Sequence, residues 1–445
     1  MQKILIANRG EIALRIIRTC QEMGIETIAI YSEADKEMPF VKAATAAFCV
    51  GEPPVNKSYL QVDKILEIAK REKVDAIHPG YGFLSENAAF AKRAIEEGII
   101  FIGPNPSTIE LMGDKIISRQ TMEKAGVPVV PGSGYGLKTS EEASVLAKTI
   151  GYPVMLKASG GGGGIGMVYC EDEQALVSSF AQTKARAMAY FGSDEVFIEK
   201  YIKDARHVEV QVFGDTHGNI VHLYERNCSI QRRHQKVIEE SPSPSLSDTA
   251  RQKMFETALR AASAVNYTNA GTIEFIVDEN ENFYFLEMNT RLQVEHPVTE
   301  MITGLDLVKW QLLIAQGERL PLLQNDITLS GHAIEFRLYA EDSVRFLPSP
   351  GKISTLHWSR QAGVRIDSGY EEGGTVTPFY DPMIAKVIIH KETRENALEE
   401  AVRFFNGVKI EGIKTNVPLF LNVLSNNDFQ NGTYTTSYLT QKLMN

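Results

Sequence analysis

The chain has 445 residues, 43% of them hydrophobic and 23% charged, which is long enough for roughly two to four globular domains. The 46 basic and 56 acidic residues give a net charge of −10, which argues against nucleic acid as a partner. No apolar run reaches membrane-spanning length, and the N-terminus lacks a signal-peptide pattern. The four cysteines form no CxxC pair, so we expect a cytoplasmic protein without a zinc site or a disulfide framework.

Strand-like and helix-like segments alternate in the N-terminal part of the chain. Strands are predicted at residues 3–7, 26–31, 76–80 and 99–103, and an amphipathic helix at residues 11–23. This alternation predicts a doubly wound, mostly parallel sheet. A single glycine, Gly10, follows the first strand where a dinucleotide-binding fingerprint needs three, so we expect neither a nicotinamide nor a flavin cofactor.

A glycine-rich loop marks the next part of the chain. After a boundary at residues 126–134, residues 135–203 form a predicted helix-and-strand unit in which six of the seven residues from 160 to 166 are glycine. Such a run costs chain entropy but lets backbone N–H groups surround phosphate oxygens. Lys157 precedes the glycines, so this is not a Walker loop. The alternative interpretation of the glycine run is a flexible linker. We favour a mobile lid that closes over the phosphate groups of a substrate.

Two further lysines accompany this loop. Lys115 begins a predicted helix, where phosphate is favoured, and Lys200 ends a strand-like segment. Glu199 and the backbone beside it are suited to read an adenine edge. Each lysine alone is typical of a solvated surface, but together with the glycine loop they indicate an ATP site.

A polar hairpin follows in the second half of the chain. Residues 272–278 and 283–288 alternate apolar and polar residues as half-buried strands do, around a short polar turn. This pairing puts Glu274 opposite Glu287, with Asn289 on the same face. Facing carboxylates repel unless a cation lies between them, and oxygen ligands suit Mg²⁺. The alternative is an exposed polar face.

The remaining segments complete the predicted organisation. Antiparallel strands are predicted at residues 207–213 and 220–225, a later strand at 332–339, and helices at 394–406 and 417–424. We expect a mixed α/β and α+β fold with three domains. They comprise an N-terminal α/β domain at residues 1–113, a nucleotide-binding domain at 114–330 with a lid at about 132–203, and a β-rich domain at 331–445.

Together these features resemble the ATP-grasp superfamily and, more narrowly, the biotin carboxylases. The matching stretches run almost end to end in the same order, and they are residues 6–13, 78–87, 157–167, 225–236, 287–303 and 346–351. The resemblance implies an N-terminal domain that precedes an ATP-grasp domain with a mobile lid, and a C-terminal biotin carboxylase domain.

The resemblance also implies a reaction. We expect a ligase that uses MgATP and bicarbonate to carboxylate biotin at N1′ through carboxyphosphate. The sequence lacks an Ala-Met-Lys-Met-type biotinylation segment, so the biotin is expected on a separate biotin carboxyl carrier protein. With carboxyltransferase subunits, this would be the first half-reaction of an acyl-CoA carboxylase, and we expect acetyl-CoA carboxylase in fatty-acid synthesis. The acceptor stays open, because similar modules serve propionyl-CoA, pyruvate and urea.

The family's bicarbonate and biotin sites can be carried over residue by residue. The bicarbonate ligands implied are Lys236, Arg291, Gln293 and the backbone of Val294. Arginine suits a planar anion with two oxygens. Glu295 is expected to be the general base, the alternative being a partner that only positions Arg291. Arg337 is expected to stabilise the enolate of biotin.

The ATP and metal sites carry over in the same way. The residues implied are Lys115, Lys157, Gly162, Gly163, Gly164, Gly166 and Met167 at the phosphates, Glu199, Lys200 and Ile202 at adenine, and His207, Gln231 and His234 at the ribose. Without the resemblance, the two histidines would be interpreted as satisfied strand residues. Glu274 and Glu287, with Asn289 nearby, would hold two Mg²⁺ ions, or Mn²⁺, that bridge the phosphates.

The chain departs from the family pattern at two positions. Ile165 stands where many members carry arginine between the last two lid glycines, so the lid lacks one positive charge. Ala362 is smaller than the aromatic residue that some members have where two protomers meet. Other residues of that contact, Arg18, Glu22 and Arg365, still match, and we therefore expect a homodimer.

Two rival functions share part of this pattern. Another ATP-grasp enzyme, such as a carbamoyl-phosphate or amino-acid ligase, would have the lid and the metal hairpin but would not need Arg291, Gln293, Glu295 and Arg337. A non-catalytic nucleotide-binding regulatory subunit would tolerate the loss of Glu295 or of a metal ligand, and none is lost. Both rivals therefore explain fewer of the residues than a biotin carboxylase does.

Overall fold

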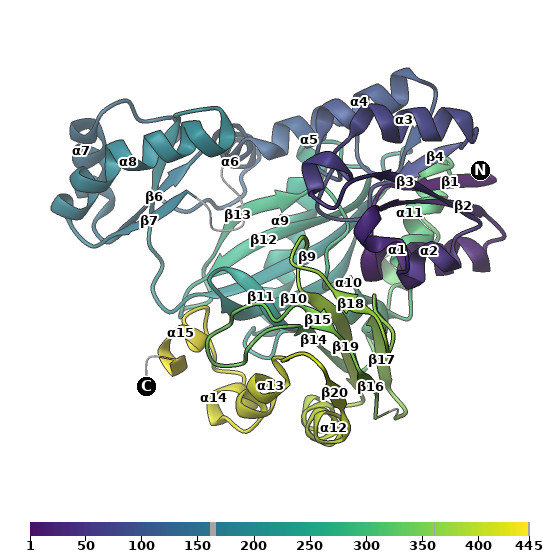
Figure 1. Cartoon of the computed structure of the whole chain (residues 1–445). Helices are drawn as coiled ribbons and strands as arrows, with labels where there is room; N and C mark the ends of the chain where they lie inside the picture. Colours follow the sequence, from purple (N-terminus) through teal and green to yellow (C-terminus); the bar gives the residue numbers. More distant parts are fainter. Residues whose placement is uncertain (161–165, 360, 444–445) are drawn as a thin grey trace.

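A parallel five-stranded sheet forms the N-terminal part of the computed structural model, which describes residues 1–160, 166–359 and 361–443 (Figure 1). Its strand order is β3-β2-β1-β4-β5, and β1 runs parallel to both of its neighbours. The strands are β1 (Lys3–Ile6), β2 (Glu26–Ser32), β3 (Ala46–Gly51), β4 (Ala76–His78) and β5 (Ile100–Phe101). The helices are α1 (Gly10–Glu22), α2 (Pro39–Ala43), α3 (Val62–Arg71), α4 (Ala88–Glu96) and α5 (Pro106–Gly113), with short 3-10 turns at Glu33–Asp35 and Val55–Lys57.

The two faces of this sheet pack against different helices. Ile4 and Ile6 of β1 belong to the same hydrophobic cluster as the apolar residues of α1. Leu5, between them, belongs to a second cluster with residues of α3 and α4. Successive side chains of a strand point to opposite faces, so helices cover both faces of the sheet. The predicted doubly wound N-terminal domain is confirmed.

The predicted lid, called the lid below, is described at residues 132–160 and 166–203, and these parts project to one side of the molecule (Figure 1). Its antiparallel sheet has the order β7-β6-β8 and packs against α7 and α8. The elements of this region are α6 (Lys115–Lys124), which precedes the lid, then α7 (Ser140–Ile150), β6 (Val154–Ala158), β7 (Met167–Cys170), α8 (Glu173–Phe191) and β8 (Val196–Lys200). Lys115 is the first residue of α6, where the Asp114 side chain caps the helix. Most of the predicted glycine loop, residues 161–165, lies outside the described residues.

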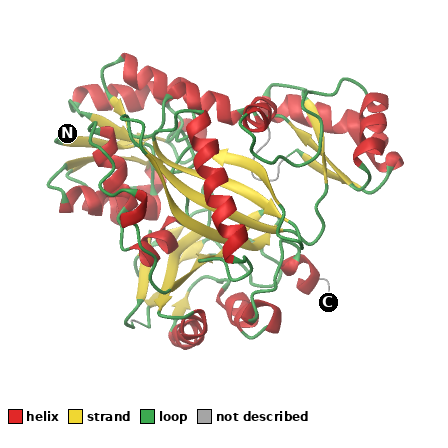
Figure 2. Cartoon of the chain, turned by 180° about the vertical axis from the view of Figure 1, so that it is seen from behind, coloured by secondary structure: helices red, strands yellow, loops and turns green. Residues whose placement is uncertain are grey.

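An eight-stranded sheet forms the centre of the molecule, in the order β13-β12-β9-β10-β11-β14-β19-β17. The predicted hairpin is present in the predicted register, with Glu274 directly opposite Glu287. One face of the sheet is crossed by α9 (Figure 2). The central elements are β9 (Arg206–Gly214), β10 (Ile220–Arg232), β11 (Gln235–Ser241), α9 (Asp248–Ala264), β12 (Asn269–Val277), β13 (Phe283–Asn289), α10 (His296–Thr303) and α11 (Leu307–Ala315), followed by a 3-10 turn at Gln324–Asp326.

The C-terminal strands extend the central sheet. The sequence predicts a β-rich unit that begins at residue 331. In the structure β14, which follows that residue, pairs antiparallel with β11, which precedes it, so a single sheet contains strands from both sides of the predicted boundary. The elements are β14 (His332–Tyr339), β15 (Gly351–Lys352), β16 (Thr355–His357), β17 (Val364–Ser368), β18 (Thr375–Val376), β19 (Met383–Lys391), α12 (Arg394–Gly407), β20 (Lys409–Glu411), α13 (Val417–Leu424), α14 (Asn427–Gln430) and α15 (Tyr438–Leu443). Within the described ranges, no helix has both the length and the apolar character that crossing a membrane requires.

Candidate active site

A cleft of about 1330 Å³ is lined by residues of the lid, the central sheet and the N-terminal domain. The predicted site residues that line it are Lys115, Lys157, Met167, Glu199, Lys200, Ile202, His207, Gln231, His234, Lys236, Glu274, Glu287, Asn289, Arg291, Gln293, Val294, Glu295 and Arg337. Gly166 is described but does not line the cleft, and Gly162, Gly163 and Gly164 lie outside the described residues. The structure thus brings together side chains that are widely separated in the sequence.

The ammonium group of Lys236 lies among three buried carboxylates. Its Nζ is 2.6 Å from Glu209, 2.9 Å from Glu274 and 2.7 Å from Glu295. Burial disfavours the charge, but the three carboxylates outweigh it and hold the pKa of Lys236 well above its ordinary value. Lys236 is therefore a fixed cation in the cleft. Sequence reasoning predicts a role for Lys236 and two of its partners but misses Glu209, because alternation in β9 alone does not show that this side chain points at a cation.

Glu295 follows β13 and stands immediately before α10. One of its carboxylate oxygens contacts Lys236, and the other accepts a 2.9 Å hydrogen bond from Arg337 Nη2. The residue is fully buried, and burial raises the pKa of a carboxyl group. Lys236, Arg337 and Arg226 outweigh that effect and lower the pKa of Glu295 well below its ordinary value. Glu295 is consequently an ionised carboxylate, able to accept a proton once its cations are shared with another anion.

The guanidinium of Arg291 is held on three sides. Arg291 donates to Glu86 at 2.8 Å, to Gln293 at 2.7 Å and to Asn289 at 3.1 Å. Burial lowers the pKa of Arg291, but the charge and the hydrogen bond of Glu86 outweigh burial, and the pKa is raised. Sequence reasoning missed Glu86, although it lies in the matching stretch at residues 78–87. The fixed, charged guanidinium borders the cleft as an anion-binding group requires.

The hairpin offers the oxygen donors expected of a magnesium site. Glu274 and Glu287 face each other across β12 and β13. Asn289 donates to Glu274 at 2.8 Å, and Gln293 donates to the same oxygen at 3.2 Å. Lys115 Nζ lies 3.4 Å from Glu287, and Lys236 Nζ lies 2.9 Å from Glu274, so each of the two carboxylates already has a lysine beside it. These residues fit Mg²⁺, which prefers few carboxylate ligands together with water and phosphate oxygens.

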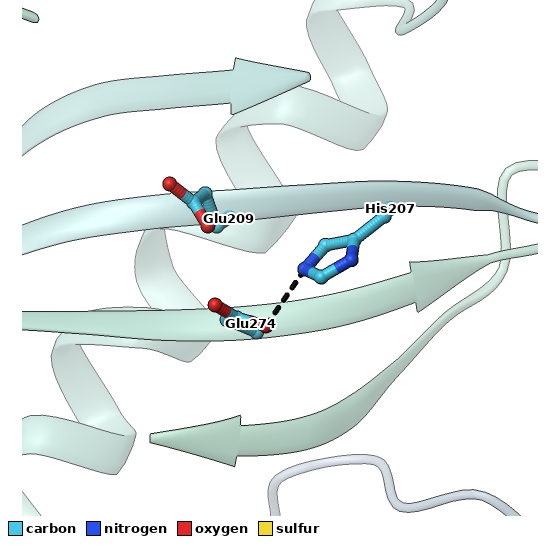
Figure 3. A group of neighbouring side chains, drawn as sticks. All are labelled: His207, Glu209 and Glu274. Atoms are coloured by element: carbon cyan, nitrogen blue, oxygen red, sulfur yellow. Dashed lines mark ion pairs between the residues drawn. The ribbon is translucent and has the colours of Figure 1, made fainter. Parts of the chain in front are cut away.

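A second group of donors, His207, Glu209 and Glu274, also lies within metal-binding distance (Figure 3). His207 Nε2 is 2.8 Å from Glu274, and the ligand atoms of all three lie within 4.8 Å of one another. The Lys236 ammonium lies close to both carboxylates of this group. The positive charge between them is therefore supplied by Lys236, and we assign no metal to this group.

The predicted nucleotide residues Lys157, Glu199 and Lys200 form contacts with one another and with nearby protein groups around the lid. Glu199 accepts from Lys157 and, at 3.1 Å, from Arg119. Lys200 Nζ donates to the backbone carbonyls of Gly151 at 2.8 Å and Tyr152 at 3.0 Å. Charged groups thus border the cleft at the lid, and a nucleotide would have to exchange some of these contacts for its own.

The two predicted ribose histidines have different surroundings. His207 is buried in β9, and its Nδ1 lies 2.8 Å from the amide nitrogen of Gln231. His234 lies in the turn between β10 and β11 with φ of 67°, so it is not a strand residue. Burial lowers the pKa of His234, and nearby Lys157 adds to that effect. A neutral imidazole at the edge of the cleft suits hydrogen bonding to a hydroxyl group.

Three family models match the chain in consecutive ranges. They are "Biotin carboxylase, N-terminal domain" at residues 1–109, "Carbamoyl-phosphate synthase L chain, ATP binding domain" at 114–323 and "Biotin carboxylase C-terminal domain" at 335–441. "Biotin carboxylase 2" of Bacillus subtilis (strain 168) is 57% identical over 441 residues, which cover 99% of each chain. The chain belongs to the biotin carboxylase family. With these three domains it is an ATP-grasp ligase, and a carbamoyl-phosphate ligase would not have the two flanking biotin carboxylase domains.

Solved structures of biotin carboxylases share the whole fold. The complex of the Campylobacter jejuni biotin carboxylase with β,γ-ATP has a TM-score of 0.97 and 47% identity, and the match covers 99% of this chain and 98% of that one. The biotin carboxylase domain dimer of Hydrogenobacter thermophilus 2-oxoglutarate carboxylase, solved with MgADP, ADP and bicarbonate, has a TM-score of 0.96 and 47% identity, covering 99% and 97%. Both matches confirm the predicted three-part architecture of the family.

Family members serve different carboxylases. Pyruvate carboxylase of Rhizobium etli has a TM-score of 0.94 and 41% identity, and the match covers 100% of this chain and 41% of that one. Its name specifies pyruvate and that of the Hydrogenobacter enzyme specifies 2-oxoglutarate, whereas the name of the Bacillus relative specifies no acceptor. Membership of the family therefore does not identify the acceptor.

Proposed function

We propose that this chain binds MgATP and bicarbonate in the cleft and carboxylates biotin at N1′ through carboxyphosphate. The observation that carries the proposal is the position of Glu295, ionised and buried between Lys236 and Arg337. Bound MgATP supplies the phosphoryl group, and its metal ions neutralise the charge that develops on the phosphates. The chain's own residues then bind the anion, move its proton and stabilise charge on biotin.

Bicarbonate is proposed to bind beside Lys236 and Arg291, with Gln293 and the backbone of Val294 as further ligands. An anion that shares the Lys236 ammonium weakens its hold on Glu295, and the proton affinity of Glu295 rises. Glu295 then accepts the proton of bicarbonate, which becomes a better nucleophile towards phosphorus. The alternative role of Glu295, positioning Arg291, has less support. Glu295 accepts from Lys236, Arg337 and Cys228, whereas its interaction with Arg291 is electrostatic only.

The nucleotide roles are proposed as the family resemblance implies. Lys115, Lys157, Met167 and the glycine loop would contact the phosphates, Glu199, Lys200 and Ile202 would lie near adenine, and His207, Gln231 and His234 near the ribose. Glu274, Glu287 and Asn289 would hold Mg²⁺ or Mn²⁺. The Campylobacter complex with β,γ-ATP and the Hydrogenobacter complex with MgADP support these assignments. We keep residues 1–113, 114–330 and 331–445 as the proposed domains, with the lid inside the second.

The partners are proposed from the same resemblance. We infer that biotin is presented by a separate carrier protein, that carboxyltransferase subunits use the carboxybiotin, and that the acceptor system is acetyl-CoA carboxylase in the cytoplasm. A homodimer is proposed because the Hydrogenobacter domain is described as a dimer. In this chain Glu22 is exposed, and Arg18 contacts Asp367 at 3.6 Å, so residues of α1 are available at that surface.

Release of ADP by the purified chain tests the proposal. We expect ATP cleavage that requires bicarbonate and is accelerated by free biotin. ATP cleavage that depends on an amino acid or ammonia instead would favour another ATP-grasp ligase. ATP binding by a folded protein without any cleavage would favour a regulatory role. Identification of the carrier and carboxyltransferase that co-purify with the chain, followed by assays with acetyl-CoA, propionyl-CoA and pyruvate, tests the proposed acceptor.

A further inference from the structure

Arg337 lies between two carboxylates, and only one of them belongs to the site described above. Its Nη2 donates to Glu295 at 2.9 Å, and its Nε lies 2.6 Å from Glu239 Oε1. The contact with Glu239 is an ion pair without hydrogen-bond geometry. Neither Arg337 Nε nor Glu239 Oε1 has a hydrogen-bond partner among the described residues. Glu239 comes from β11 and is fully buried, so it approaches Arg337 from within the protein.

A second buried carboxylate accompanies Glu239. Glu335 of β14 pairs directly with Glu239 across the ladder, and both are fully buried. None of their four carboxylate oxygens has a hydrogen-bond partner among the described residues. Two adjacent buried carboxylates do not both ionise, because each charge raises the cost of the other. The pair therefore holds one proton and one negative charge.

The surroundings indicate which member keeps the charge. The charged groups that face the pair are Arg337 of β14, Lys386 of β19, Lys236 of β11, Glu209 of β9 and Glu295. Burial raises the pKa of Glu335 well above its ordinary value, and it raises that of Glu239 to about 7. Among the described residues, only Glu239 of the two carboxylates forms an ion pair, with Arg337 at 2.6 Å. We therefore assign the negative charge to Glu239 and the proton to Glu335.

We propose that Glu239 is a positioning residue that holds Arg337 in place during the transfer of the carboxyl group to biotin. The inference rests on the proposed function and adds a residue to it. When Glu295 accepts the bicarbonate proton, it becomes neutral and Arg337 loses one counter-charge. Glu239 takes no part in that transfer and keeps the guanidinium anchored. The Nη2 edge that Glu295 releases is then free for the enolate oxygen, which forms when the phosphate released from carboxyphosphate accepts the N1′ proton of biotin.

A double-mutant cycle tests this inference. Glu239→Gln keeps the shape of the side chain but removes the charge, so we expect kcat/KM for biotin to fall roughly 10- to 100-fold because Arg337 is misplaced. ATP affinity and the bicarbonate-dependent ATP cleavage measured without biotin should stay within about twofold of wild type. If Glu239 acts through Arg337, adding Glu239→Gln to Arg337→Lys should cost less than about threefold.

Glu400→Gln is the matched control. Glu400 is a buried carboxylate on α12, and it contacts Lys391 at 2.9 Å. We expect this variant to have wild-type kinetics for biotin, so that loss of a buried charge alone does not explain the effect. The thermal unfolding midpoint of each variant shows that it is folded.

Three results would overturn the inference. Wild-type kcat/KM for biotin in Glu239→Gln is the first, and an equal loss of biotin-independent ATP cleavage is the second. The third is an undiminished effect of Glu239→Gln in the Arg337→Lys background. A wild-type chain that does not carboxylate biotin at all would contradict the proposed function itself, and with it this inference.

Discussion

At the scale of single residues, the candidate site is a set of charges that compensate one another. Lys236 contacts Glu209, Glu274 and Glu295, and Glu295 also contacts Arg337. Burying an unpaired charge is costly, so each of these groups depends on its neighbours. A substrate anion would change the balance most at Glu295, which is held by two cations that an anion can share.

Replacement of Glu295 by glutamine tests its role as the base. The amide cannot accept the bicarbonate proton, so we expect carboxylation of biotin to fall roughly 10²- to 10⁴-fold. ATP affinity, measured by calorimetry, should stay within about threefold of wild type, because Glu295 is not among the proposed nucleotide ligands. The exposed Glu256 provides a control in Glu256→Gln. Near-normal turnover of Glu295→Gln would place the base elsewhere.

Replacement of Glu287 by glutamine tests the metal hairpin. Removing one carboxylate charge should raise the Mg²⁺ concentration needed for half-maximal ATP cleavage roughly 10- to 100-fold. Glu279→Gln, in the exposed turn of the same hairpin, should leave that concentration unchanged. An unchanged Mg²⁺ requirement in Glu287→Gln would exclude Glu287 as a ligand.

The sequence predicts the residues of the site better than their contacts. Glu274, Glu287 and Asn289 could be placed on one face because strand alternation is local. Glu86 was missed, because its contact with Arg291 spans 205 residues. Glu239 was missed for the same reason, since only the pairing of β11 with β14 brings it to Arg337.

At the scale of elements, a buried ion cluster attaches the C-terminal segments to the sheet. Glu240 of β11 lies 2.6 Å from His332 of β14 and 2.6 Å from Arg394 of α12, and Tyr434 donates to it as well. Burial raises the pKa of Glu240, but His332 and Arg394 outweigh burial and lower it to about 2. The cluster therefore stabilises the ionised form of Glu240.

Replacement of Glu240 by glutamine tests this attachment. A pKa lowered from 4.5 to about 2 corresponds to about 3 kcal/mol of stability at neutral pH. Because the pKa is lower in the folded state, this contribution is complete above about pH 4.5 and is lost as the pH falls towards 2. Denaturant unfolding should show a loss of about 3 kcal/mol at pH 7 and a smaller difference from wild type in acid. A difference that is constant with pH would contradict the assignment.

The boundaries of some elements could be predicted, but the arrangement of the sheet could not. The helix α13 and the strand β14 have the predicted limits, because their hydrophobic patterns are local. The joining of β14 to β11 depends on backbone hydrogen bonds between segments far apart in the sequence, which no local pattern shows. The predicted glycine loop at residues 161–165 lies outside the described residues, so its role as a lid stays a prediction.

At the scale of the whole molecule, the cleft collects residues from all three parts of the chain. Lys115 and Lys157 come from the region of the lid, Glu295 follows the metal hairpin, and Arg337 comes from the C-terminal strands. An ATP site without Glu295 and Arg337 would suffice for phosphoryl transfer to other acceptors. Under the proposed function, the presence of Glu295 and Arg337 beside the Glu274–Glu287 hairpin is what would distinguish carboxylation of biotin from other ATP-grasp reactions.

Transfer of labelled carbon from bicarbonate to free biotin tests the proposed carboxylation most directly. Purified chain, ATP, Mg²⁺, ¹⁴C-bicarbonate and biotin should yield acid-labile labelled carboxybiotin, and omission of ATP or Mg²⁺ should abolish it. The Glu295→Gln variant should bind ATP but form almost no labelled product. Absence of labelled carboxybiotin from a folded wild-type chain that cleaves ATP would contradict the proposal.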